Sequence, residues 1–196
     1  MLKNTKKLAL NSKILRLLLI PAIIVSTPLF TNIQNAKAGM EFQWDQNSGY
    51  RRLKWFQKEK KARFRNTIYF FFRPSDRNAD LLKINLAIPK TFKSTLEKEK
   101  ISFCKVRIGG FDSRTRCLED IPADIEINTN ESSMRSIDIY PYSPIPSNKD
   151  NKDSYAIVFK KIFNPKKSGL YQFHSFGQPK GKTVSRYLGS WTILID

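Results

Sequence analysis

The stretch LKINLAIP, residues 82–89, decides the fold class of this 196-residue chain. Its apolar residues fall at every second position, and Lys83, Asn85 and Ala87 lie between them. An alternation with a period of two predicts a strand that has one buried side and one solvent-facing side. Pro89 ends the strand because proline has no backbone N–H to donate to a neighbour.

The same pattern recurs outward from this stretch in both directions. Seven further strand candidates lie at 67–73, 101–108, 124–128, 136–140, 154–163, 170–176 and 186–195. The two candidates at 154–163 and 170–176 are expected to form a hairpin around the turn residues 164–169. Only 91–100 has helical composition, and it is short. About eight strands separated by turn signals predict a mainly β chain, an antiparallel two-sheet β-sandwich of immunoglobulin-like type.

The first 38 residues have the composition of an export signal. Lys and Arg open the segment, a mostly apolar run follows from Leu15 to Phe30, and Ala36-Lys37-Ala38 supplies small residues for a signal peptidase. This order predicts a cleavable signal peptide at 1–38 with cleavage after Ala38. An uncleaved membrane anchor is disfavoured because prolines interrupt the apolar run. The signal peptide predicts export to the periplasm or the outer cell envelope. No later stretch is apolar enough to span a bilayer, so the mature chain is expected to be soluble or peripherally bound.

Residues 39–66 form a basic, aromatic lead-in to the predicted sandwich domain at 67–196. One interpretation of Arg51–Arg65 is a short basic amphipathic helix that lies on a membrane. The alternative is a solvated helix or irregular arm whose aromatic residues pack on the core. If the aromatic and cationic side chains are exposed, they form a binding segment. Its candidate residues are Trp44, Arg51, Arg52, Lys54, Trp55, Lys58, Lys60, Lys61, Arg63 and Arg65.

The charge of the chain favours a polyanionic partner. The formal net charge of +18 falls to +12 when the six Lys and Arg of residues 1–38 are removed. A cationic surface attracts polyanions through long-range fields that salt screens. Export argues against nucleic acid, which leaves an anionic envelope glycan or a membrane surface. The opposing interpretation is that an AT-rich genome inflates the 23 Lys and 13 Asn without any ligand.

The two cysteines agree with an exported chain. Cys104 and Cys117 flank the glycine pair at 109–110, where a chain reversal is expected. An even number of cysteines in an exported protein favours a disulfide. The alternative is two free buried thiols.

The sequence contains no positive sign of catalysis, a metal site or a cofactor. His174 is the only histidine, and no Gly-x-Ser-x-Gly motif accompanies it, so a structural role is favoured. Ser175 points to the opposite side of the predicted strand. Paired carboxylates are the remaining possibility, because two of them hydrolyse glycans in many enzymes. The candidates are Glu119, Asp120, Asp124 and Glu126.

Several short motifs carry a family resemblance. They are Thr67-Ile-Tyr-Phe-Phe-Phe, the strand that ends in Ile88-Pro89, and the order Asn164-Pro165, Gly169-Leu-Tyr-Gln-Phe and Tyr187-Leu-Gly-Ser-Trp. In this order the chain resembles domain of unknown function 2808 over residues 66–196. The resemblance implies a secreted, periplasmic or envelope protein from a cyanobacterium, and it implies no catalytic residues. The strong basic charge and the cysteine pair are departures that the resemblance does not explain.

Three functions remain open at this point. The favoured one is a non-enzymatic, exported envelope domain that binds an anionic glycan or lipid surface through Arg51–Arg65. The second is a wall-glycan hydrolase that uses Asp/Glu pairs. The third is a structural subunit of an envelope assembly that docks through an exposed sheet edge. The sequence predicts no oligomeric state.

Overall fold

The computed structural model describes residues 49–110 and 113–196. These residues form ten strands and two short 3-10 helices, η2 (Pro74–Asp76) and η3 (Lys98–Lys100). The strands are β1 (Trp55–Gln57), β2 (Arg65–Phe72), β3 (Leu81–Ile88), β4 (Ile101–Arg107), β5 (Arg116–Asp120), β6 (Ala123–Thr129), β7 (Arg135–Pro141), β8 (Ser154–Phe163), β9 (Gly169–Pro179) and β10 (Arg186–Ile195). The predicted signal peptide, its cleavage residues Ala36 and Ala38, and Trp44 lie outside the described residues. Among the described helices, none is long and apolar enough to cross a membrane.

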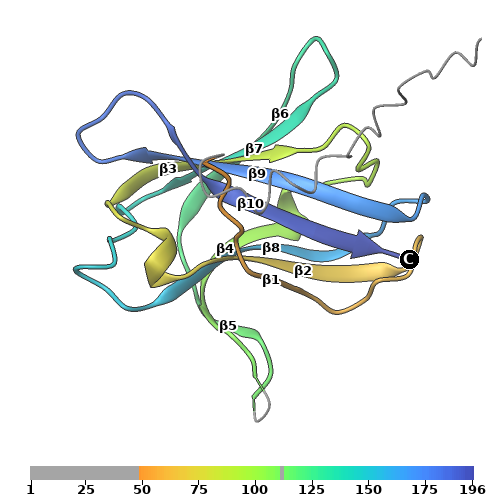
Figure 1. Cartoon of the computed structure of the whole chain (residues 1–196), viewed down its shortest axis with the longest axis horizontal. Helices are drawn as coiled ribbons and strands as arrows, with labels where there is room; N and C mark the ends of the chain where they lie inside the picture. Colours follow the sequence, from red (N-terminus) through yellow and green to blue (C-terminus); the bar gives the residue numbers. More distant parts are fainter. Residues whose placement is uncertain (1–48, 111–112) are drawn as a thin grey trace, which may run out of the picture. The chain divides into compact units, whose positions relative to one another are not determined.

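Two five-stranded sheets make up the sandwich. One has the order β1-β2-β8-β4-β5 and the other the order β10-β9-β3-β7-β6. Every pair of neighbouring strands is antiparallel. Figure 1 shows β9 and β10 crossing one layer while β2 and β8 cross the other. The predicted antiparallel two-sheet sandwich is confirmed, with ten strands in place of eight.

The main core lies between the sheets and is rich in aromatic rings. Phe70 of β2 contacts Phe173 of β9 at 4.9 Å and Trp191 of β10 at 5.1 Å between ring centroids. All three side chains are fully buried. Burying a large side chain contributes about 1.5–3 kcal/mol, so this cluster supplies much of the attraction between the sheets.

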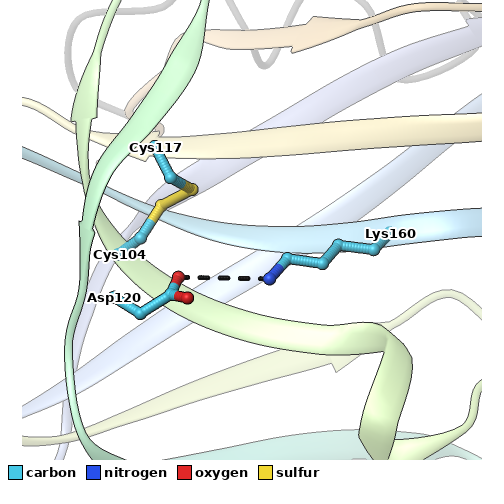
Figure 2. The surroundings of a disulfide bond; sticks show 4 residues. All are labelled: Cys104, Cys117, Asp120 and Lys160. Atoms are coloured by element: carbon cyan, nitrogen blue, oxygen red, sulfur yellow. Dashed lines mark ion pairs between the residues drawn. A yellow bond between two sulfur atoms is a disulfide. The ribbon is translucent and has the colours of Figure 1, made fainter.

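A second, smaller cluster lies on the outer side of β2, β8 and β4. Tyr69, Phe71 and Val158 are buried there beside Cys104. Cys104 is bonded to Cys117 of β5, and the two Cα atoms are 5.7 Å apart (Figure 2). Cys117 packs on the cluster, so the disulfide fixes β5 at this side of the sheet.

The described part of the lead-in, residues 49–66, belongs to the sandwich. The backbone of Leu53 donates to Ser190 O at 2.8 Å, and Ser190 N donates to Arg51 O at 2.8 Å. Two residues after Leu53, β1 begins and pairs with β2 in the other sheet. The helix considered for Arg51–Arg65 is therefore wrong, because residues 51–57 bridge the two sheets in extended form and residues 61–64 form a turn before β2.

Two local expectations are also wrong. Strands β8 and β9 do not form a hairpin, because β8 pairs with β2 and β4 whereas β9 pairs with β10 and β3. The turn at 164–168 instead carries the chain from one sheet to the other. Of the helical expectation at 91–100, only η3 forms, and β4 follows it directly.

Candidate anion-binding site

The first loop of the candidate site follows β3 and is held by a buried aromatic ring. Phe92 is fully buried and contacts Tyr171 at 5.3 Å and Phe173 at 4.9 Å between ring centroids. Its N–H donates to Pro89 O at 2.8 Å, which closes a turn directly after the strand. With Phe92 directed inward, Thr91 and Lys93 on either side are exposed.

Side-chain hydrogen bonds of Ser94 and Arg135 fix the same loop. Ser94 is buried, and its hydroxyl donates to the carbonyl oxygen of Phe163 at the end of β8. The Arg135 guanidinium donates to Ser94 O at 2.7 Å and to the carbonyl oxygen of Phe92. Burial lowers the pKa of Arg135 below its usual value. Arg135 thus stabilises the loop by donating hydrogen bonds to two of its carbonyl groups.

The second loop joins β8 to β9 and is ordered by a pair of buried amides. Asn66 Nδ2 donates to Asn164 Oδ1 at 3.0 Å. Asn164 Nδ2 donates to the carbonyl oxygens of Glu59, at 3.2 Å, and Lys61, at 2.9 Å. Further along, the Tyr171 hydroxyl donates to Lys167 O at 2.5 Å. Asn164 and Pro165 are buried, so the next residues of the turn face solvent.

The two loops enclose a surface pocket of about 590 Å³ that is rich in lysine. We call it the lysine pocket, and its lining residues are Lys90, Thr91, Lys93, Pro165, Lys166 and Lys167. None of these six residues is acidic. None of the four lysines forms an ion pair with any described carboxylate. Four ammonium groups around one pocket repel one another, and a bound anion would relieve that repulsion.

Part of the predicted binding segment adjoins the lysine pocket. Arg63 N donates to Pro165 O at 3.2 Å, so the loop with Lys60, Lys61 and Arg63 lies against the second loop. Glu59 is engaged locally, because its carboxylate accepts the N–H groups of Lys60 at 2.8 Å and Lys61 at 2.9 Å. These bonds lower the pKa of Glu59 and keep it ionised. The side chains of Lys60, Lys61 and Arg63 are exposed.

The other described residues of the predicted segment lie elsewhere. Arg51 forms a 3.3 Å ion pair with buried Asp76, and Arg52 bridges to Ser190 of β10. Trp55 is partly buried and packs against the main core, whereas Lys54 is exposed. Lys58 lines a different pocket with Gly109 and Arg114, and Arg65 lies over the ring of Phe163 at 5.1 Å. The structure therefore divides the predicted segment instead of gathering it into one site.

His174 belongs to a small hydrogen-bonded group on β9 and β10. Its Nδ1 lies 2.7 Å from Ser190 Oγ, and the Tyr187 hydroxyl lies 2.6 Å from the same oxygen. Ser190 is fully buried. The His174 side chain is exposed at its edge, but its neighbours partly desolvate the ring, and this desolvation lowers the pKa of His174 below its ordinary value. The serine oxygen is thus enclosed by two partners and is not presented to a substrate.

The acidic candidates lie on two edge strands of different sheets. Glu119 and Asp120 belong to β5, whereas Asp124 and Glu126 belong to β6. Asp120 is 4.0 Å from Lys160 Nζ (Figure 2), and Asp124 accepts a hydrogen bond from the Tyr142 hydroxyl at 3.2 Å. All four carboxylates are exposed. Asp120 also lies near both cysteine sulfurs, but those sulfurs are bonded to each other and offer no thiolate to a metal.

The sequence pattern did not identify Lys90, Lys93, Lys166 and Lys167 as site residues. The one local signal is a residue beside each lysine pair that is buried in the fold. This residue is Phe92 in the first loop and Pro165 in the second. Each pair by itself resembles an ordinary solvated turn. Only the arrangement of the two sheets brings the pairs together.

A family model described as "Protein of unknown function (DUF2808)" matches residues 45–195. No curated protein sequence matches the chain. Among solved structures, the bacterial hydrophobin BslA is 12% identical, with 75% of this chain and 95% of that chain covered and a TM-score of 0.44. The collagen-binding domain of a Staphylococcus aureus adhesin is 13% identical, with 72% and 95% covered and a TM-score of 0.37. The collagen-binding subdomain of the Enterococcus faecalis surface protein ACE is 9% identical, with 74% and 97% covered and a TM-score of 0.39. Similarities at this level carry no information on function.

Proposed function

The chain belongs to the DUF2808 family, and we propose that this member is an exported, non-enzymatic envelope domain that binds an anionic glycan or lipid surface. The binding site is the lysine pocket together with the neighbouring Lys60, Lys61 and Arg63. The observation that carries the proposal is the meeting of four lysines from two distant loops around one pocket; within residues 49–110 and 113–196 these lysines form no ion pair and no acidic residue lines the pocket.

The lysine pocket suits a repeating or extended anion better than a small one. Lysine ammonium groups are flexible point charges, so they match charged groups at variable spacing instead of one fixed geometry. Each lysine near an anionic membrane contributes about 1 kcal/mol of attraction at moderate salt. Seven cations on adjoining loops therefore provide useful affinity without a deep cavity.

The export part of the proposal comes from the sequence of residues 1–38. Its basic start, apolar centre and Ala36-Lys37-Ala38 end support removal of the segment outside the cytoplasm. Periplasm or outer envelope is the proposed location, and a cyanobacterial source is the corresponding proposal from the family resemblance. In that location, anionic lipids and acidic glycans are the abundant polyanions.

The absence of catalysis is part of the same proposal. A nucleophile must be reachable, and the Ser190 oxygen is buried between His174 and Tyr187. Asp124 and Glu126 lie on the exposed side of an edge strand, where water has free access to both. A glycosidase needs its two carboxyl groups across a substrate cleft, about 5–10 Å apart.

The experiment is co-sedimentation of the purified protein with isolated cell envelopes at low and high salt. We expect binding that weakens as salt rises, because ions screen exposed charges over roughly 10 Å at 0.1 M. Vesicles containing phosphatidylglycerol and extracted acidic glycan, used separately, then show which surface is bound. Binding that is unchanged by salt, or absent at both concentrations, contradicts the proposal. The basic charge would then be explained by genomic composition and not by a ligand.

A further inference from the structure

A second cationic feature is the hairpin formed by β4 and β5, which extends from the sandwich in Figure 1. Its base is fixed by the disulfide between Cys104 and Cys117. Near its end, Gly109 N donates to Thr115 Oγ1 at 2.9 Å, and Gly110 N donates to Ser113 O at 3.1 Å. A Cβ on Gly109 would lie 2.6 Å from Thr115 N, so the two strands approach here as closely as only glycine permits. The described part of the hairpin is therefore a braced element.

Three arginines gather on this braced hairpin. Arg107 of β4 and Arg116 of β5 lie directly opposite each other in the strand register. Side chains at such a position share one side of the sheet at close range, and like charges there are destabilising. Arg114 and Ser113 join the pair to line a surface pocket of about 270 Å³. We call this feature the arginine pocket.

Among residues 49–110 and 113–196, no carboxylate lines the arginine pocket, in contrast to its surroundings. Neighbouring Lys105 forms a 2.6 Å ion pair with Asp153, and Lys160 lies 4.0 Å from Asp120. By contrast, Arg107, Arg114 and Arg116 make no ion pair or side-chain hydrogen bond with residues 49–110 or 113–196. Asp120 and Asp153 are thus paired with lysines beside the pocket and not with its arginines.

The chemistry of the guanidinium group identifies the class of ligand. Its planar N–H groups bind two oxygens of one oxyanion at once, which ammonium groups do not. Three such groups offer more positive charge and more donors than one carboxylate accepts. We propose that the arginine pocket binds a tetrahedral, doubly charged oxyanion of the phosphate-monoester class. This inference does not depend on the proposed function, because none of its residues lines the lysine pocket.

The test is a titration of the purified, 15N-labelled protein with inorganic phosphate, followed by NMR against chloride at equal ionic strength. We expect saturable shifts at the amides of 105–107 and 113–117 with phosphate alone. Sodium acetate provides the carboxylate arm. Equal responses to phosphate, acetate and chloride, or shifts spread over all cationic loops, would overturn the inference.

Matched variants separate the arginine pocket from general charge. Replacing Arg107, Arg114 and Arg116 by Gln should weaken phosphate binding about tenfold or more, since charge-assisted bonds are lost. Replacing exposed Lys149, Lys180 and Lys182 by Gln removes the same charge and should leave the phosphate shifts in place. Replacing the three arginines by Lys keeps the charge but not the paired donors, and it should restore only part of the affinity. Equal loss in the first two variants would contradict the inference.

Melting temperatures test the site independently of any change that the triple substitution makes to the hairpin. We expect phosphate to raise the melting temperature of the unmodified protein, and Arg116→Gln to raise it without phosphate by removing like-charge repulsion. A single substitution that lowers stability, with no phosphate effect in the parent, would refute the site. Glycerol phosphate and vesicles of phosphatidic acid then distinguish a soluble phosphate monoester from a lipid headgroup.

Discussion

Asn164 is the residue on which the candidate site most depends. Its side chain bonds to Asn66 of β2 and to two carbonyl oxygens of the 59–61 segment, so two loops and the start of β2 share one buried amide. Buried polar groups that lose their partner cost about 1–3 kcal/mol each. The motif Asn164-Pro165, which supported the family resemblance, therefore has a structural cause.

We predict that Asn164→Ala lowers the free energy of unfolding by about 2 kcal/mol, because the carbonyl groups of Glu59 and Lys61 lose their donor. Urea denaturation followed by tryptophan fluorescence measures the change. Asn78→Ala is the matched control, since Asn78 is exposed and surface substitutions usually stay within about 0.5 kcal/mol. Equal changes in the free energy of unfolding for the two substitutions would contradict the stabilising role of the Asn66–Asn164 amide pair.

Gly189 supplies a second prediction at this scale. Its φ is +147°, and an added Cβ would lie 2.7 Å from both Arg51 O and Leu53 Cγ. Gly189→Ala should therefore displace the segment at 51–53 from β10 and lower the melting temperature. Amide hydrogen exchange should show faster exchange at Leu53 and Ser190, whose N–H groups make these contacts. Unchanged protection at both amides would contradict the structural reason given for this glycine.

His174 gives the pH dependence. Burial lowers its pKa in the folded chain, so on acidification the unfolded chain binds a proton that the folded chain resists. Stability should accordingly fall as the pH drops through the ordinary histidine pKa of about 6.5 toward the lower folded value. NMR titration of the ring measures the pKa directly, and His174→Gln should reduce this slope. A ring pKa at or above the ordinary value would contradict this prediction, because stability would then not fall on acidification through His174.

At the scale of elements, the sequence predicted those strands that alternate strictly. LKINLAIP became β3 because its inward residues have the full depth of the core beneath them. β1 was missed because three residues are too few to show a period, and β5 because its residues are mostly exposed on an edge strand. The hairpin prediction at 164–168 was wrong because proline and glycine indicate a turn but do not indicate whether the chain returns to the same sheet.

The disulfide sets the stability of the β4–β5 hairpin. It links residues separated by 13 positions, for which constraint of the unfolded chain contributes about 3 kcal/mol. We predict that replacing both cysteines by Ser lowers the free energy of unfolding by up to this amount. Because β5 is an edge strand, exchange should rise first at its amides and not in β2 or β9. Uniform loss of protection over both sheets would show instead that the bond supports the whole core.

At the scale of the whole molecule, the net charge was readable from the sequence but its position was not. The segment at 51–65 is densely basic in sequence, yet Arg51 pairs with Asp76 and Trp55 packs inward. The lysine pocket instead combines residues about 75 positions apart, brought together because β3 and β8 end on the same side of the sandwich. Such a meeting depends on strand topology, which alternation alone does not specify.

The most direct test of the account compares two charge-matched variants in the envelope-binding assay. One replaces Lys90, Lys93, Lys166 and Lys167 by Gln. The other replaces Lys149, Lys152, Lys180 and Lys182, in the loops that join β7 to β8 and β9 to β10. We predict that the first weakens binding at least about tenfold, while the second changes it by less than about threefold. Equal losses would contradict a defined site and show that binding follows net charge alone.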